Sequence, residues 1–354
     1  AYVDLESDLT KQFLLGVAGR FENYSDFGST STGKIAARYE PVPRFAVRGA
    51  ASSGFRAPSL GQEFFSSTAT NFIAGQPFDI RTFPVATAEA RLLGASDLEP
   101  EKSVNMSAGV ALEPLTSLAL TIDFYRITIK DRIVLSDNFT GATIQALFPQ
   151  TGSTAAGGRF FTNAIDTRSN GVDVVANYGY SFSNRSVLKL TGGYNHNTVK
   201  VTGVDSTPPN LTAFQETLFG RVERTRIEKG NPRDNLFASA NYSLGAFGLT
   251  ARVQRYGEVS VAGATATNAT GTLDQTYGAK TITDLSAAYT LRRITATIGA
   301  DNVFDVYPDR NLNPGDPNTG NGGLSNFGIF PYAGISPFGS NGRFVYTKLT
   351  IGLP

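Results

Sequence analysis

The sequence predicts an all-β protein whose antiparallel strands belong to a transmembrane β-barrel. Apolar and polar residues alternate with period two along most of the chain, and a helical period is sustained nowhere. The connections between these segments alternate between short turns and long loops, which is typical of membrane barrels. No run of apolar residues is long enough to form a transmembrane helix.

Composition narrows the possible functions. The 354 residues carry 31 Lys and Arg against 30 Asp and Glu, so the charge balance does not indicate a nucleic-acid partner. The absence of Cys excludes disulfides, thiolate metal sites and cysteine nucleophiles, and a single His cannot form a His cluster. We therefore predict no catalytic residues, no metal site and no cofactor, and we do not expect an enzyme.

The period-two segments predict about thirteen strands. They lie near residues 1–8, 11–22, 33–41, 44–54, 102–113, 117–132, 159–182, 186–199, 235–245, 247–257, 280–291, 293–302 and 343–353. The alternation changes phase at Phe124-Tyr125, because Ile127 and Ile129 continue from Tyr125. Either a β-bulge lies there or the strand leaves the bilayer through an aromatic girdle.

The lengths of the connections predict which end of the barrel faces outward. Short turns are expected near residues 9–10, 41–43, 113–116, 183–185, 244–246 and 291–292. Long loops are expected around Gly28, Gln76, Gly141, Asn210, Ala266 and Gly322. In bacterial outer-membrane barrels the short turns are periplasmic and the long loops extracellular. Because such barrels have an even number of strands, we expect an odd number upstream of Ala1 and a sheet that is not stable alone.

Several short motifs occur at the ends of the predicted strands. They are Gly54-Phe55-Arg56-Ala57-Pro58, Leu98 to Ser103, Phe124-Tyr125, Lys130 to Ile133, Asn170 to Asp173, Asp301 to Asp305, Tyr307-Pro308 and Ser336 to Gly339. In type and in order along nearly the whole chain, these motifs resemble those of the TonB-dependent outer-membrane receptors.

The resemblance implies a partial barrel and a transport function. Barrels of this family have roughly twenty-two strands, so residues 1–354 would be the C-terminal part, without the plug domain or signal peptide. The implied protein is a multi-pass receptor of the bacterial outer membrane, in contact with its lipid and with the TonB complex through the plug. The implied function is uptake of a ferric siderophore; the alternatives are uptake of an oligosaccharide, peptide or cobalamin, a passive porin-like barrel, or a soluble sugar-binding β-protein.

Aromatic residues in two long loops are the candidate ligand-binding residues. One loop contains Phe64, Phe65 and Phe72 together with Arg81, and the other contains Phe330 and Tyr332. Exposed rings beside cationic side chains suit anionic, partly aromatic ligands such as ferric catecholates. The alternative is that these rings pack the loops against one another.

Other polar residues have structural interpretations. Arg56 is expected to anchor a loop rather than to contact ligand. His196 has no second ligand nearby in the sequence and is expected to be a surface residue. The Asn- and Gly-rich residues 316–322 indicate a turn cluster rather than a calcium loop. The polar face of the strands is expected to line the lumen of the barrel. The charged residues on this face are Asp123, Asp173, Lys189, Arg252 and Asp301.

Overall fold

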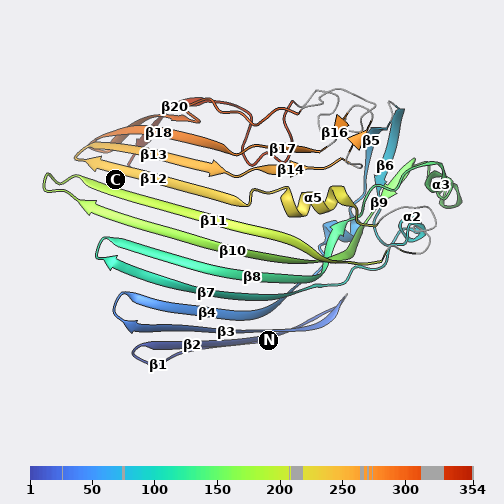
Figure 1. Ribbon diagram of the computed structural model, residues 1–354, viewed down its shortest axis with the longest axis horizontal. Coiled ribbons are helices and arrows are strands. Elements are labelled where there is room, and N and C mark those ends of the chain that lie inside the picture. The colour runs from blue at the N-terminus through green and yellow to red at the C-terminus, as the bar shows by residue number, and fades with distance from the viewer. Residues whose placement is uncertain are drawn as a thin grey trace.

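A single antiparallel sheet dominates the computed structural model, which describes residues 1–25, 27–73, 76–206, 208, 218–263, 267–268, 271–272, 274–311 and 331–352. The sheet has 13 strands, each paired with its neighbours along the chain (Figure 1). In order they are β1 (Tyr2–Thr10), β2 (Phe13–Tyr24), β3 (Gly28–Val42), β4 (Phe45–Arg56), β7 (Glu101–Leu115), β8 (Leu118–Leu135), β10 (Phe161–Ser181), β11 (Val187–Val204), β12 (Asp234–Leu244), β13 (Phe247–Tyr256), β18 (Lys280–Leu291), β19 (Ile294–Asp301) and β20 (Phe344–Ile351). All thirteen predicted strands are confirmed.

The sheet forms a curved, open wall with its short turns at one end and its long connections at the other (Figure 1). β1 and β20 are the two edges of the sheet and do not pair with each other. The strands reach further toward the long connections than predicted. The strand expected over 33–41 starts at Gly28, and the strand expected over 186–199 ends at Val204.

The short turns fall close to their predicted places. The first is shifted, because β1 continues through Thr10 and the chain reverses at Lys11 and Gln12 rather than at residues 9–10. Four tight turns require left-handed backbone, at Arg44 with φ 70°, Arg185 with φ 64°, Gly245 with φ 57° and Arg292 with φ 55°. Glycine adopts this conformation without steric cost, whereas Arg44 does so with some strain.

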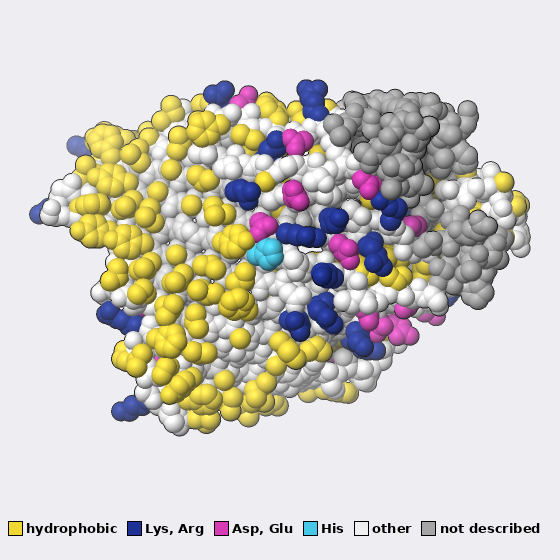
Figure 2. All heavy atoms as spheres, viewed as in Figure 1, with side chains coloured by type: hydrophobic (Ala, Val, Ile, Leu, Met, Phe, Trp, Pro, Cys, Tyr) yellow, Lys and Arg dark blue, Asp and Glu magenta, His cyan; other side chains and the backbone are white. Residues whose placement is uncertain are grey.

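The outer face of the wall is apolar. Leu249, Leu285 and Leu349 lie on it and are 53%, 44% and 64% exposed. Cross-strand pairing aligns such residues in rows, one of which runs through Ala240, Ala251, Leu285, Ala300 and Val345. Figure 2 shows the resulting belt, which covers the half of the molecule nearer the short turns. We call it the apolar belt.

Aromatic residues border the apolar belt near the short turns. The Tyr180 and Phe182 rings lie 4.7 Å apart, and the Phe247 and Tyr289 rings 4.8 Å apart. Aromatic girdles of this kind mark the interface between lipid and water in membrane barrels.

The inner face of the wall is polar, as predicted. The Arg48 Nε donates to Asp123 Oδ1 at 2.8 Å, and the Asn195 Nδ2 donates to Asp173 Oδ1 at 2.6 Å. Strand alternation places the other three predicted lumen residues, Lys189, Arg252 and Asp301, on this same face.

The phase change at Phe124-Tyr125 is not a β-bulge. Pairing with β10 continues without a shift from Phe124–Val172 to Tyr125–Gly171. Phe124 is 60% exposed on the outer face. Tyr125 lies on the inner face, where its ring occupies the position that a Cβ on Gly171 would take. The alternation changes because the strand passes beyond the apolar belt here, in agreement with the girdle alternative.

The long connections fold into a second region with its own core. We call the described parts of residues 57–100, 136–160, 205–233, 257–279 and 302–342 the loop cap. Phe139, Phe148 and Phe160 are fully buried in it. Phe83 packs against Phe148 with ring centroids 5.5 Å apart, and Phe139 against Phe160 at 5.8 Å.

The loop cap also contains short elements that the sequence did not predict. The helices are α1 (Leu60–Phe64), α2 (Ala88–Leu92), α3 (Ala142–Gln145), η1 (Phe148–Thr151) and α5 (Arg221–Lys229). The extra strands are β5 (Ser67–Ile73), β6 (Gln76–Thr82), β9 (Gly157–Arg159), β14 (Val259–Val261), β15 (Thr267–Asn268), β16 (Gly271–Thr272) and β17 (Gln275–Tyr277). Within the described residues no helix has the length and apolar character needed to cross a membrane.

Candidate ligand-binding site in the loop cap

Two of the sequence motifs join the wall to the loop cap through one ion pair. Arg56 ends β4 and lies directly opposite Glu101, which begins β7. The Arg56 Nε donates to Glu101 Oε2 at 2.9 Å and its Nη2 donates to Oε1, a bidentate arrangement. Glu101 is only 5% exposed and also accepts from the backbone N–H of Ile133 at 2.8 Å. Arg56 is therefore placed as a structural anchor.

A later motif fixes the chain where it leaves β19. Asn302 has φ 50°, and its side chain exchanges hydrogen bonds of 2.8 and 2.9 Å with the backbone of Val306. The Asp305 carboxylate accepts from the backbone N–H of Arg343 at 2.8 Å, which brings the start of the last strand to this turn. These side chains thus make hydrogen bonds with backbone groups that the turn takes out of regular strand pairing.

The first predicted group of ligand residues lies around α1 and β6. Phe64 and Phe65 are 64% and 48% exposed. Arg81 lies 3.5 Å from Ser66 Oγ and 5.5 Å from the centroid of the Phe83 ring. Phe72 belongs to β5, but its side chain lies outside the described residues. Phe83 itself is buried, so here the alternative of loop packing applies.

The second predicted group makes separate contacts. Tyr332 is half-buried and stacks on Tyr307 with ring centroids 6.2 Å apart. The Arg310 guanidinium lies 6.0 Å from the centroid of the Tyr332 ring. Phe330 and the residues 316–322 lie outside the described residues. In the first group the arginine thus lies beside the buried Phe83 ring, and in the second an arginine lies beside the half-buried Tyr332 ring.

An arginine-rich cavity in the loop cap was not predicted. It encloses about 480 Å³ and is lined by Ser136, Asp137, Asn138, Arg159, Gly220, Arg221, Val222, Glu223 and Arg226. The end of β8, β9 and the start of α5 supply these residues. The only sequence signal was the charge-rich run from Arg221 to Lys229 within a long connection.

The three arginines of the cavity differ in how they are neutralised. Arg221 forms a bidentate pair with Asp274 at 2.8 and 2.7 Å. Arg226 pairs with Glu223 at 2.7 and 2.9 Å. Among the described residues the Arg159 guanidinium donates to the neutral Thr82 hydroxyl alone, at 3.0 Å, and burial lowers its pKa. Arg159 is therefore the cation that an anionic ligand would neutralise best.

Burial also affects the acidic residue of the cavity. Desolvation raises the pKa of the Glu223 carboxyl, although the nearby Arg226 and Arg159 oppose this effect. The Glu223 side chain is 13% exposed. Protonation of Glu223 would release Arg226 and make the cavity more positive.

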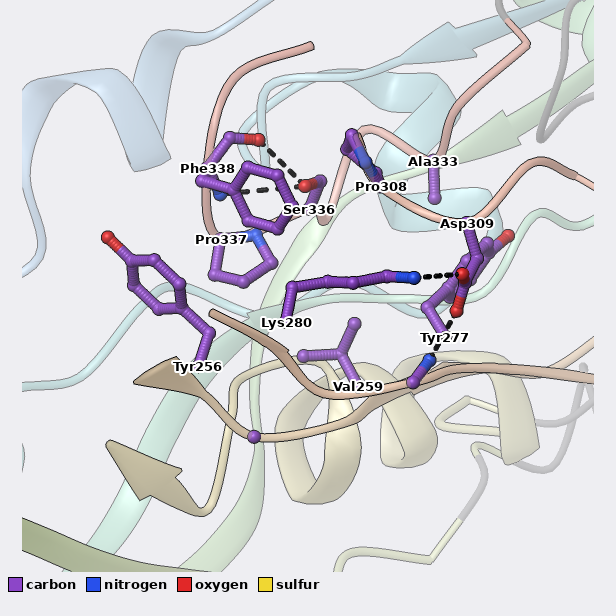
Figure 3. A pocket seen from close by; sticks show the side chains of 12 residues that line it. Tyr256, Val259, Tyr277, Lys280, Pro308, Asp309, Ala333, Ser336, Pro337 and Phe338 are labelled. Atoms are coloured by element: carbon purple, nitrogen blue, oxygen red, sulfur yellow. Dashed lines mark hydrogen bonds and ion pairs between the residues drawn. The ribbon is translucent and has the colours of Figure 1, made fainter. Parts of the chain in front are cut away.

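A second cavity, shown in Figure 3, lies where the Ser336-Pro337-Phe338 motif packs beside the ends of β13 and β18. We call this packing contact the joint. Its open volume of about 10 Å³ admits no more than a water molecule. The Lys280 Nζ donates to Asp309 at 2.5 Å, and Tyr277 donates to Asn311 at 2.6 Å. Burial raises the pKa of Tyr277 to about 12. This joint holds the Ser336-Pro337-Phe338 motif beside the ends of β13 and β18.

His196 lies on the outer face, and the carboxylate oxygen Asp234 Oδ1 accepts a 2.8 Å hydrogen bond from the His196 Nδ1. No group of three or more His, Asp or Glu side chains suited to a metal ion occurs among the residues that the structure describes. The prediction that His196 is a surface residue with a polar partner is in agreement with this geometry.

Comparison with known proteins identifies the class to which the chain belongs. Residues 1–303 match the family model of the TonB-dependent receptor-like β-barrel. The chain therefore belongs to this family, whose members are transport receptors rather than enzymes.

Relatives of known name cover only parts of the chain. An iron-regulated outer membrane virulence protein of Vibrio cholerae is 24% identical over 132 residues, which are 37% of this chain and 18% of that protein. The vitamin B12 transporter of the same species is 37% identical over 54 residues, 15% of this chain and 9% of that protein.

Solved structures match over almost the whole chain. The siderophore receptor PirA of Acinetobacter baumannii superposes with a TM-score of 0.63 at 16% identity, covering 99% of this chain and 45% of PirA. A mutant ferric enterobactin receptor of Pseudomonas aeruginosa in complex with enterobactin gives a TM-score of 0.65 at 17% identity, covering 99% and 44%. The chain thus spans less than half the length of these receptors, and the likeness shows a shared fold.

Proposed function

We propose that the protein is a receptor of the bacterial outer membrane that takes up a ferric siderophore with energy supplied through TonB. The proposal rests on two features that occur in one chain. The wall carries an exposed apolar belt suited to lipid, and the loop cap carries exposed rings and arginines suited to an anionic aromatic ligand. The siderophore receptors among the structural neighbours support this choice of ligand.

In this proposal the ligand first contacts the rings of the loop cap and then an arginine. Phe64 and Phe65 remain exposed although they are large and apolar, so they are available for stacking. Arg81 lies beside the buried Phe83 ring and Arg310 beside the predicted Tyr332 ring, and Phe72 and Phe330 remain candidates in the same loops. Arg159 would provide the charge that fixes the ligand, because its side-chain partner among the described residues is the neutral Thr82 hydroxyl.

The binding test uses the complete receptor purified in detergent and a radio-iron-labelled ferric catecholate. Arg159→Gln should weaken binding about tenfold or more, since it removes a charge-assisted hydrogen bond. Arg185→Gln is the matched control, because Arg185 lies in a short turn at the opposite end of the wall. Equal dissociation constants for Arg159→Gln and the native receptor would exclude Arg159 from the site.

Cobalamin is the second candidate ligand, because the vitamin B12 transporter shares 37% identity over a 54-residue stretch. Competition decides between the two ligands. If unlabelled cobalamin displaces nothing and an excess of the ferric catecholate displaces the label, the siderophore proposal is retained. Saturable binding of cobalamin alone would replace it.

A passive barrel makes a different prediction in planar bilayers. A receptor whose lumen holds a plug should conduct almost no current, whereas an open porin-like barrel should show steady conductance. Steady conductance by the complete receptor would contradict energy-dependent uptake.

A further inference from the structure

One arginine of the loop cap cavity is paired with a carboxylate from a different connection of the chain. Arg221 begins α5 and lines the cavity, whereas Asp274 lies in the connection between β13 and β18. The Arg221 Nη1 and Nη2 atoms donate to the two carboxylate oxygens of Asp274 at 2.8 and 2.7 Å. A carboxylate of the protein therefore occupies a guanidinium group that faces the cavity.

The geometry of this contact is the one that an anionic ligand would adopt. A guanidinium group is planar, and its two terminal nitrogens match two adjacent oxygens of one anion. Asp274 presents its two oxygens to Arg221 in this way. A ligand with two adjacent anionic oxygens would use the same donors, so it and Asp274 cannot bind Arg221 bidentately at the same time.

The pair is accessible enough for such an exchange. The side chains of Arg221 and Asp274 are 37% and 40% exposed. Ion pairs with this exposure contribute little net stability, because water competes with each partner. The pair of Arg226 with Glu223 is different, since Glu223 is 13% exposed and lies on the same helix three residues away.

The backbone holds Asp274 at this position. The Gly263 N–H donates to Asp274 Oδ1 at 3.1 Å, and the Gly263 carbonyl accepts from the Arg221 Nη1 at 2.6 Å. Gly263 is buried and follows β14, which lies beside α5 (Figure 1). The carboxylate is therefore held against the arginine by a fixed backbone contact.

The alternative is that the pair only ties α5 to the neighbouring connection. Other contacts already hold the helix. The Glu228 side chain accepts from the backbone N–H of Val201 on β11 at 2.9 Å, and Ile227 packs against the core of the loop cap. Loss of the Asp274 carboxylate should therefore leave α5 in place. A simple tie predicts weaker or unchanged ligand binding after this loss, whereas competition predicts tighter binding.

We propose that Asp274 is an internal competitor of the ligand: its carboxylate occupies Arg221 in the empty receptor, and an anionic ligand displaces it on entering the cavity. This inference rests on the proposed function, because it takes the cavity as a site for an anionic ligand. The contact is autoinhibitory, since it holds the affinity of the cavity below the value that its arginines would otherwise give.

The test uses the complete receptor in detergent and equilibrium binding of the radio-iron-labelled ferric catecholate. Asp274→Asn keeps the size of the side chain but removes its charge, and it should tighten binding about threefold. Asp97→Asn is the matched control, because Asp97 also pairs with an arginine of the loop cap but does not line the cavity. This control should bind as the native receptor does.

A double-mutant cycle separates competition at Arg221 from a general effect of charge. Arg221→Gln should weaken binding, and adding Asp274→Asn to it should bring no further gain, because no guanidinium remains to be released. An equal gain in the native and the Arg221→Gln backgrounds would overturn the proposal. So would weaker binding by Asp274→Asn alone.

Hydrogen exchange of the Gly263 amide gives a second readout in the native receptor. Saturating ferric catecholate should speed up this exchange, because the displaced Asp274 carboxylate no longer accepts from the amide. Unchanged or slower exchange would contradict displacement, since a tie that stays in place keeps the amide protected.

The outcomes separate this inference from the proposed function. If the native receptor binds the ferric catecholate and Asp274→Asn binds it no more tightly, the inference alone is wrong. If the native receptor does not bind the ferric catecholate, the proposed function is wrong, and the same variants are titrated with iron-free citrate. A gain for Asp274→Asn with citrate that disappears in the Arg221→Gln background would retain the inference, and no gain would overturn it as well.

Discussion

The wall and the loop cap use the same apolar residue types in opposite ways. In the wall, Leu249 and Leu349 are more than half exposed, whereas in the cap Phe148 and Phe160 are fully buried. The wall satisfies its backbone hydrogen bonds through strand pairing and leaves its apolar side chains exposed, and in the proposed location lipid would cover them. The cap buries its apolar side chains in a core of its own. One chain therefore contains two regions that place their apolar residues in opposite ways, and the proposed function assigns lipid to the first and water to the second.

The largest expected effect concerns the cap core. Phe148→Ala should destabilise the loop cap by about 3–5 kcal/mol, because it leaves a cavity beside Phe83. The wall should keep its resistance to heat in detergent. Limited proteolysis of the loops and the electrophoretic heat shift of the barrel report the two regions separately.

The control for this prediction is Phe64→Ala. Phe64 is 64% exposed, so its loss should leave protease resistance unchanged. If Phe148→Ala melted wall and cap together, the two regions would be one cooperative unit and the comparison would be wrong.

The next effect concerns the wall. Ala251→Arg places a charge within the apolar belt and should cost about 2–4 kcal/mol of stability in a bilayer. Thr250→Arg, one residue away on the inner face, should cost far less. Urea titration of the folded barrel in lipid vesicles measures both variants. Equal losses for the two would show that the outer face does not meet lipid.

The junction between wall and cap should show an intermediate effect. Arg56→Ala leaves the 5% exposed Glu101 without its cation and should cost about 2 kcal/mol. Arg91→Ala is the matched control, because its partner Asp97 is 87% exposed and the pair should contribute less than about 1 kcal/mol. Equal losses of stability in Arg56→Ala and Arg91→Ala would contradict the expected difference between the buried and the exposed ion pair.

The smallest effect is a pH dependence of ligand binding. Burial holds the pKa of Glu223 above its ordinary value of 4.5, so the carboxylate becomes neutral as the pH falls through that raised value. Arg226 is then released and affinity for an anionic ligand should rise a few-fold. Glu223→Gln should bind more tightly than the native receptor and show a flatter pH profile. Dissociation constants of the ferric catecholate across this range test the sign.

The wall was predictable from sequence because its periodicity is a direct consequence of having one apolar and one polar face. Leu285 and Ala287 alternate with Ser286 and Ala288 on a strand whose pairing the structure confirms. Arg56 and Glu101 were recognised in two separate motifs. Their ion pair could not be predicted, because it depends on the register between β4 and β7, which the structure supplies.

The cap could not be predicted in the same way. Its core joins residues that are far apart in sequence, such as Phe83 and Phe148, and its elements are too short to show a period. The single strand expected over 159–182 is interrupted, because Phe160 turns into the cap core between β9 and β10. The arginine cavity depends on the same long-range packing, which is why only its charge-rich segment was visible in the sequence.

The central claim is that the outer rows of the wall face lipid while the inner rows do not. Residues 1–354 contain no cysteine, so no native thiol within them competes with a single introduced cysteine for the spin label. The most direct measurement is the accessibility of nitroxides at residues 284 to 289 of β18 to oxygen and to a water-soluble nickel complex, with the receptor in lipid vesicles. We expect strong oxygen accessibility at Leu285, Ala287 and Tyr289 and weak accessibility at Asp284, Ser286 and Ala288. Uniform accessibility along the strand, or the opposite alternation, would contradict it.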